Sequence, residues 1–204
     1  MVINRRFNRT GGGMLSRIKW QDILLFAVLC LPMVFGSFES RADTLFGKVV
    51  SVTDGDTITV LDSSNTQHVI RLFAVDAPET SCHIGKPSKR NDECREIGQP
   101  FGKASKKSLS QLVYGKSVNV EIQPGQTYGR SIGTVWAGPV NANLEQVRRG
   151  YAWMWRKYAK KGLLPEEYRE MEEAENQARE MELGVWSVAN SIPPWEYRHH
   201  KGGR

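Results

Sequence analysis

Short stretches that alternate between apolar and polar residues dominate the chain from position 44 onward, and they predict β-strands. Because each stretch has a period of two or is rich in β-branched residues, we expect five strands, at residues 45–52, 56–61, 67–75, 117–122 and 130–136. Asp54-Gly55 and the polar segment 62–66 are typical of tight turns. The first three strands are therefore expected to form a β-meander.

Three other segments have the apolar spacing of helices. We expect them at residues 98–113, at 143–149, and from Pro165 to the glycine at 184. The tail after Trp186 is predicted to be loosely ordered. Five strands with a helix between the third and the fourth are typical of an OB-fold, so the predicted fold class is mainly β with helices (α+β), a five-stranded barrel with about three helices.

The first 42 residues have the pattern of an export signal. Basic residues up to Lys19 precede the apolar run 23–35, which has the length of a signal-peptide core and is short for a membrane span. Small residues at 40–42 favour cleavage after Ala42, which predicts a secreted or periplasmic protein. The alternatives are an uncleaved anchor and a start at Met14.

Beyond this segment the chain is nearly balanced in charge. The formal net charge is +6, but six of the 28 Lys and Arg residues and only two of the 22 Asp and Glu residues fall within positions 1–42. Bulk charge is therefore weak evidence for a nucleic-acid partner. The length of 204 residues predicts one domain, over 43–190, followed by a flexible C-terminal tail over 191–204.

Cleavage of the signal would leave two cysteines, Cys82 and Cys94. An even number of cysteines in an exported chain favours a disulfide, which would close the polar loop between them. The alternative is a metal site formed by Cys82, His83 and Cys94, although the sequence offers no fourth ligand at a suitable spacing.

Two aspartates are candidate ligands of a hard divalent cation. Asp56 opens the second predicted strand and Asp76 closes the third, so a meander would bring both to one end of the barrel. Pro78 restricts Ala77 to extended backbone, and the Ala77 carbonyl would add a third oxygen ligand. A ligand set made only of oxygens favours calcium or magnesium over zinc. The simpler alternative for each aspartate is a turn or a strand end.

Further residues nearby point to phosphate chemistry. Glu79 is placed to act as a general base on water. Arg71, in an otherwise apolar strand, and Arg130 have the donors to hold a phosphate and to stabilise its transition state. Each alone would be explained by a surface ion pair or a solvated side chain. With the two aspartates they match metal-assisted phosphodiester hydrolysis, in which Tyr128 would bind phosphate or stack on a base.

This ordered set resembles the thermonuclease family, whose founding member is staphylococcal nuclease. The similar segments are Asp54-Gly55-Asp56-Thr57, residues 71–79 and Tyr128-Gly129-Arg130, and the similarity extends from about 45 to 186. The resemblance implies an OB-fold enzyme that cleaves DNA and RNA with calcium and leaves 3′-phosphates. It also implies that calcium is bound by Asp56, Asp76 and the Ala77 carbonyl, that Glu79 acts on water, that Arg71 and Arg130 bind phosphate, and that Asp54 is a neighbour of the metal.

The sequence departs from the founding member at several positions. That protein has a threonine where Ala77 stands, a basic residue where Thr127 stands and a tyrosine near the position of Arg156. Substrate contacts, for which we predict Tyr128 and Arg156, and base preference are therefore expected to differ, whereas the reaction is not. The founding member also lacks cysteines, so the predicted bridge would be specific to this branch.

The sequence therefore predicts an exported, calcium-dependent nuclease that acts on DNA and RNA, is monomeric and has no stable membrane association after signal cleavage. A non-catalytic OB-fold protein that binds single strands is the main alternative. It would use aromatic and basic residues such as Trp153, Trp155 and Lys157, but it would not need Arg71, Glu79 and Arg130 together. A structural calcium-binding envelope protein would need the aspartates but neither arginine.

Overall fold

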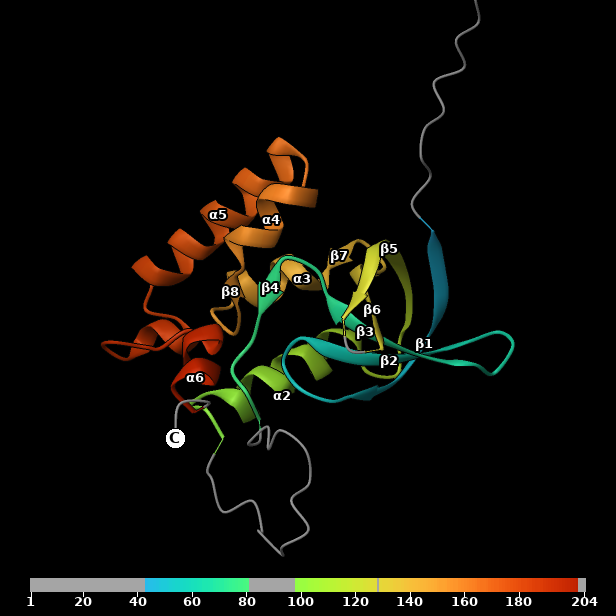
Figure 1. The fold of residues 1–204 in the computed structure, drawn as a ribbon, viewed down its shortest axis with the longest axis horizontal. Coiled ribbons are helices and arrows are strands. Elements are labelled where there is room, and N and C mark those ends of the chain that lie inside the picture. The colour runs from blue at the N-terminus through green and yellow to red at the C-terminus, as the bar shows by residue number, and fades with distance from the viewer. Residues whose placement is uncertain (1–42, 81–97, 128, 202–204) are drawn as a thin grey trace, which may run out of the picture. The chain divides into compact units, whose positions relative to one another are not determined.

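The computed structural model of the chain describes residues 43–80, 98–127 and 129–201, all of which belong to the compact unit Arg41–Arg204 (Figure 1). The predicted export signal at 1–42, the predicted cysteine pair Cys82 and Cys94, and Tyr128 lie outside the described residues. No helix in the part of the chain that the structure describes is long and apolar enough to cross a membrane.

Five strands form a closed barrel, which confirms the predicted OB-fold architecture. The barrel strands are β1 (Thr44–Val52), β2 (Thr57–Asp62), β3 (Gln67–Leu72), β5 (Ser117–Thr127) and β6 (Arg130–Ala137). They are hydrogen-bonded in the order β3-β2-β1-β5-β6, and a parallel pairing of β3 with β6 closes the ring. β7 (Val140–Asn141) adds to β6, whereas β4 (Val75–Asp76) and β8 (Trp153–Met154) form a separate antiparallel pair.

The helices lie to one side of the barrel, and Figure 1 shows α4, α5 and α6 away from the barrel strands. They are α2 (Gly102–Val113), α3 (Ala142–Arg148), α4 (Arg156–Gly162), α5 (Pro165–Glu180), the 3-10 turn η1 (Gly184–Ser187) and α6 (Pro194–Lys201). The three predicted helices correspond to α2, α3 and α5. Helix α4 was not predicted.

The C-terminal segment differs from the flexible tail predicted over 191–204, because part of it forms α6. Pro194 is the first residue of this helix, a position where the fixed φ of proline and its missing N–H favour a helix start. The helix is also held by contacts with distant residues, which are described below with the site.

The third strand is shorter than predicted, because the chain turns at Phe73 and Ala74. Ala74 has a φ of 61°, which is outside the strand region. The Phe73 N–H donates to the Gly133 carbonyl at 2.8 Å, and the Ala74 carbonyl accepts the Trp155 N–H at 2.7 Å. The chain therefore leaves the barrel at Leu72 and pairs again as β4 beside β8.

The core lies inside the barrel and under the helices. Alternate positions of β2 and β3 supply Ile58, Val60, Ile70 and Leu72, each at most 1% exposed. Helices α2, α3 and α5 cover this core with Leu109, Val113, Val147, Met171 and Ala174. Burial of these side chains is the main favourable contribution to folding, and it fixes the ends of β2 and β3 on which the site is built.

Candidate active site

The turn between β1 and β2 carries Asp54 and Asp56. The Thr53 N–H donates to the Thr57 carbonyl at 2.9 Å and the Asp56 N–H donates to Asp54 Oδ1 at 3.2 Å, which forms the tight turn predicted from Asp54-Gly55. Asp56 is only 2% exposed. The Thr57 hydroxyl donates to its Oδ1 at 2.9 Å. The turn therefore holds a buried carboxylate at the start of β2.

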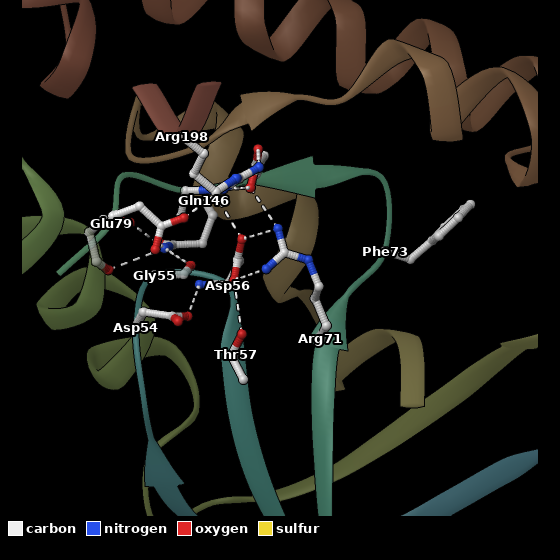
Figure 2. A network of polar contacts seen from close by, with 12 residues as sticks. Asp54, Gly55, Asp56, Thr57, Arg71, Phe73, Glu79, Gln146 and Arg198 are labelled. Carbon is white, nitrogen blue, oxygen red and sulfur yellow. Dashed lines mark hydrogen bonds and ion pairs between the residues drawn. The ribbon is translucent and has the colours of Figure 1, made fainter. Parts of the chain in front are cut away.

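Gly55 fits this turn because two helices pack closely against it. A Cβ at this position would lie 1.8 Å from Ser105 Oγ on α2 and 2.7 Å from the Ala77 Cβ, so no side chain is accommodated without movement. From α3, the buried Gln146 donates from Nε2 to the Gly55 carbonyl at 2.8 Å (Figure 2). The position of Asp56 is thus fixed by the packing of the helices on the barrel.

Arg71 lies in β3 directly across from Thr57 and binds two buried aspartates. Its Nη1 donates to Asp56 Oδ1 at 3.0 Å, and its Nη2 lies 2.8 Å from Asp56 Oδ2 and 2.6 Å from Asp76 Oδ1. Figure 2 shows this side chain extending from the strand towards the acidic groups, whereas the Phe73 ring points away from them. The unusual charge in an apolar strand therefore has a specific position between Asp56 and Asp76.

Asp76 and Ala77 approach Asp56 from the other side. β4 pairs with β8, with Asp76 opposite Trp153, and this pairing directs the chain back towards the barrel. Asp76 is fully buried, and the Ala77 N–H donates to Asp56 Oδ2 at 3.1 Å. The backbone of Ala77 is thus hydrogen-bonded to one predicted cation ligand, Asp56, and directly follows the other, Asp76, in the chain.

Glu79 is held through its backbone by the segment that leads into α2. Its N–H donates to Gln99 Oε1 at 3.3 Å, and its carbonyl accepts the Gln99 N–H at 2.9 Å. The approach is close enough that a Cβ on Gly102 would lie 2.2 Å from the Glu79 carbonyl oxygen. The side chain is left to face the acidic groups.

Arg198 from α6 completes the group of charged residues. Its Nη2 lies 2.6 Å from Asp76 Oδ2, and its Nη1 lies 3.2 Å from Asp76 Oδ1 and 2.6 Å from Glu79 Oε1. Figure 2 shows Glu79 and Arg198 directed towards each other. We refer to Asp54, Asp56, Arg71, Asp76, Glu79 and Arg198 as the acidic cluster, since four carboxylates face two guanidinium groups.

The pKa values of two carboxyl groups in the acidic cluster, those of Asp54 and Asp76, are raised. Burial, and after it the charge of Asp56, raises the pKa of Asp54 to about 7. Burial raises the pKa of Asp76 to about 6, with Asp56 adding to the effect and Arg198 and Arg71 opposing it. Burial alone would lower the pKa of Arg198, but its contacts with Asp76 and Glu79 outweigh burial and raise it. A further positive charge would therefore be stabilised here.

The residues present fit a hard divalent cation. Asp56 and Asp76 are both buried, both lie within 2.8 Å of the same Arg71 nitrogen, and both offer oxygens only. Among the described residues, no group of three or more His, Cys, Asp or Glu side chains has a metal-binding arrangement. The residues that would hold a cation are Asp56, Asp76 and the Ala77 carbonyl, with water completing the shell, as the resemblance implies.

Arg130 shares a sheet face with Arg71. In the parallel pairing of β3 with β6, Arg71 lies opposite Ile132. Since side chains alternate along a strand, Arg130 is on the same face as Ile132, about 6.6 Å nearer the start of β6. The two arginines predicted to bind phosphate are thus on the same face of adjacent strands.

Arg156 is placed differently from these residues, against helix α5. Its Nη1 lies 2.7 Å from Glu175 Oε2, and its Nη2 lies 3.6 Å from Glu172 Oε1. Glu175 is fully buried and also accepts the Met154 N–H at 3.0 Å. Arg156 therefore has a structural partner, and the substrate contact expected from the sequence stays a prediction.

Sequence reasoning missed three residues that shape the site: Gln99, Gln146 and Arg198. Gln99 and Gln146 act through hydrogen bonds to the backbone of Glu79 and Gly55, which leave no local pattern in the sequence. For Arg198 the sequence did contain a signal. The proline before Trp195 is suited to begin a helix, and Arg198 belongs to that helix, α6.

One protein family and several known proteins are similar in sequence to this chain. Residues 69–188 match the family described as Staphylococcal nuclease homologue. An "Uncharacterized endonuclease" of Escherichia coli O157:H7 is 36% identical over 77% of this chain and 87% of its own. A "Micrococcal nuclease" of Shigella flexneri is 35% identical over 85% and 91%, and "Endonuclease Htp3" of Saprolegnia parasitica is 32% identical over 89% and 97%. The residues matched by the family include Arg71, Asp76, Glu79 and Arg130 and end before α6.

Proposed function

Since the chain belongs to the staphylococcal nuclease homologue family and is a nuclease, we propose that it is calcium-dependent and hydrolyses phosphodiester bonds of DNA and RNA with low sequence specificity. The observation that supports this most is the convergence of Asp56, Asp76 and Glu79 on Arg71 and Arg198 at one end of the barrel. Carboxylates whose pKa values are raised by burial and by a neighbouring charge, as those of Asp54 and Asp76 are, are typical of functional sites.

Arg71 is the proposed phosphate ligand. A guanidinium has five N–H donors in one plane, and hydrogen bonds to Asp56 and Asp76 engage two of them. The remaining donors suit a phosphate oxygen, and the aspartates fix the orientation of the group before substrate arrives. Arg130, on the same sheet face, would bind a second oxygen. Both would stabilise the charge that develops on phosphorus in the transition state.

Glu79 is the proposed general base. One guanidinium nitrogen of Arg198 touches both Glu79 Oε1, at 2.6 Å, and Asp76 Oδ1, at 3.2 Å, so the two carboxylates border the same small space. Water in that space would give a proton to Glu79 and attack phosphorus, and the bond to the 5′ oxygen would break. Cleavage in this direction leaves a 3′-phosphate, as the resemblance implies.

Calcium bound by Asp56, Asp76 and the Ala77 carbonyl would supply positive charge to the phosphate and lower the pKa of a bound water. The surrounding chain positions these ligands. Gly55 and Gln146 fix the turn that carries Asp56, and the β4–β8 pairing fixes Asp76.

The proposal includes export and a monomeric state. Residues 1–42 would direct the protein to the periplasm or to the medium, where free calcium is more abundant than in the cytosol. N-terminal sequencing of exported protein checks this part, and Asp43 is the expected first residue.

A nuclease assay with matched variants tests the proposed activity. Purified mature protein is incubated with single-stranded DNA, duplex DNA and RNA, in calcium or in chelator. We expect loss of polymer in calcium only, and products labelled at the 5′ end should change mobility after phosphatase treatment. Asp56→Asn should abolish most activity, whereas Asp62→Asn, at the end of β2 away from the acidic cluster, should retain it.

Each other outcome has a defined meaning. Equal cleavage in calcium and in chelator would overturn calcium dependence. Binding without cleavage in both conditions would support the single-strand binding protein instead. An Asp56→Asn variant with normal turnover would exclude the acidic cluster as the active site.

A further inference from the structure

Helix α6 contacts residues of the acidic cluster that are far from it in the sequence. The segment before it is held by Gln99, whose Nε2 donates to the Ile192 carbonyl at 2.6 Å. In the helix, the Trp195 ring stacks on Trp155 with centroids 6.1 Å apart and planes inclined by 17°. One turn later Arg198 enters the cluster. Three separate contacts therefore place this helix over the site.

Arg198 binds the carboxylates on which the proposed activity depends. It binds both oxygens of Asp76 and one oxygen of Glu79, which is the planar two-pronged geometry that guanidinium groups adopt with carboxylates. Its guanidinium carbon also lies 5.9 Å from the centre of the Trp155 ring. In this arrangement Arg198 fills the space between the proposed cation ligand and the proposed base.

Asp76 has both of its oxygens engaged by guanidinium groups. Arg71 and Arg198 share Oδ1, and Arg198 also holds Oδ2. A cation coordinated by Asp76 would therefore compete with these guanidinium groups for the same two oxygens, and its positive charge would be repelled by them. Arg71 is 14% exposed and belongs to barrel strand β3, near its end, whereas Arg198 is 31% exposed and belongs to helix α6. Withdrawal of Arg198 would leave the barrel intact.

We propose that α6 is an autoinhibitory element, in which Arg198 occupies Asp76 and Glu79 until a divalent cation at Asp56 and Asp76 displaces it. This inference rests on the proposed function, because it takes Asp76 as a cation ligand and Glu79 as the base. With Arg198 bound, the space for the attacking water is filled and Glu79 Oε1 is held in an ion pair. Activity would then follow the cation concentration through the release of α6.

Such an arrangement has a thermodynamic consequence that does not depend on catalysis. If Arg198 and the cation exclude each other, the cation must break the Arg198 contacts before it binds. The free energy of those contacts then weakens the affinity for the cation, and a variant that lacks Arg198 binds the cation more tightly. The same holds for Trp195, which helps to hold the helix in place. Release of α6 would also separate the Trp155 and Trp195 rings, which changes their fluorescence.

The test is a calorimetric titration of calcium into the mature protein and into three variants, without substrate. Arg198→Gln should bind calcium more tightly, on the order of ten-fold, which lies within the usual range of coupling between sites. Trp195→Leu should shift affinity in the same direction while Arg198 is kept. Arg148→Gln is the matched control, because Arg148 pairs with Glu145 and Glu170 at the surface, and its affinity should equal that of the unaltered protein.

The outcomes separate this inference from the proposed function. Equal or weaker calcium binding by Arg198→Gln would overturn the autoinhibitory role and leave the cation site standing. Absence of calcium binding in every variant would overturn the cation site and the autoinhibitory role with it. Tighter binding by both Arg198→Gln and Trp195→Leu, with a calcium-dependent change in tryptophan fluorescence of the unaltered protein, supports the inference.

Discussion

Asp76 and Glu175 are both fully buried, and each binds two arginines, yet their surroundings differ in charge. Asp76 meets Arg71 and Arg198 in the company of other carboxylates, and burial together with Asp56 raises its pKa to about 6. Glu175 receives Arg156, Arg179 and the Met154 N–H. The first carboxylate lies among other carboxylates, whereas the second contacts two guanidinium groups and one backbone N–H.

The difference shows which property of a buried carboxylate indicates function. Burial and an ion pair are common to both, so neither is diagnostic. Glu175 ties β8 to α5, and since β8 pairs with β4, it supports the strand that carries Asp76. Asp76 belongs to a group that the protein leaves short of positive charge, which is the condition for binding a cation.

The largest expected effect is on rate, from Glu79→Gln in the acidic cluster. A glutamine keeps the size of the side chain but cannot accept the proton from water, so turnover should fall by about 10²- to 10⁴-fold. Substrate binding should persist and the free energy of unfolding should change little. Single-turnover cleavage measured beside a binding assay checks this, and near-normal turnover would exclude Glu79 as a catalytic group.

Glu175→Ala should produce the reverse pattern. The change leaves the Met154 N–H and two arginines without their buried acceptor, which should cost about 3–5 kcal/mol of stability. The rate per folded molecule should stay within a few-fold of normal. Urea unfolding together with activity corrected for the folded fraction checks both parts. A large loss of rate with normal stability would remove the distinction between the two carboxylates.

The pH dependence of the stability of Asp54→Asn tests the excess of negative charge in the acidic cluster. The pKa of Asp54 is raised from 3.8 to about 7 in the folded protein, so between these values the folded state holds a proton that the unfolded chain has lost. The contribution of Asp54 to stability is therefore largest below pH 4 and falls as the pH rises to 7. Asparagine removes this dependence, and relative to the unaltered protein the variant should gain about 3–4 kcal/mol between pH 4 and pH 7.

Urea unfolding in chelator at pH 4, 5, 6 and 7 measures that gain as the difference between Asp54→Asn and the unaltered protein. Asp43→Asn is the control for the loss of an exposed aspartate. Parallel stability curves for Asp54→Asn and the unaltered protein would show that Asp54 ionises normally in the fold.

The smallest expected effect comes from Arg179→Gln, at the edge of the Glu175 site. Arg179 is 48% exposed, lies 3.4 Å from Glu175 Oε2 and stacks over the Trp186 ring at 3.9 Å. Loss of both contacts should cost about 0.5–1 kcal/mol and leave activity unchanged. Thermal unfolding is sensitive enough to detect it. A cost comparable to that of Glu175→Ala would show that Arg179, rather than Arg156, balances the buried charge.

The local pattern determined the barrel and most of the acidic cluster. Alternation with a period of two assigns strands and faces, and the stretch from Arg71 to Glu79 concentrates a cation, a carboxylate and a base within one strand and turn. Asp56 follows because consecutive antiparallel strands are neighbours. These inferences needed only contacts between elements that adjoin in sequence.

The tertiary structure alone decided the break at Ala74, the support of Gly55 by Gln146 and the entry of Arg198. Arg198 and Asp76 are 122 positions apart, and Gln146 and Gly55 are 91 apart. Periodicity states which face a side chain occupies, but it does not state which distant surface that face meets. Packing of α2, α3 and α6 on the barrel determines which distant residues become partners, because charges and backbone polar groups that are buried there must be paired.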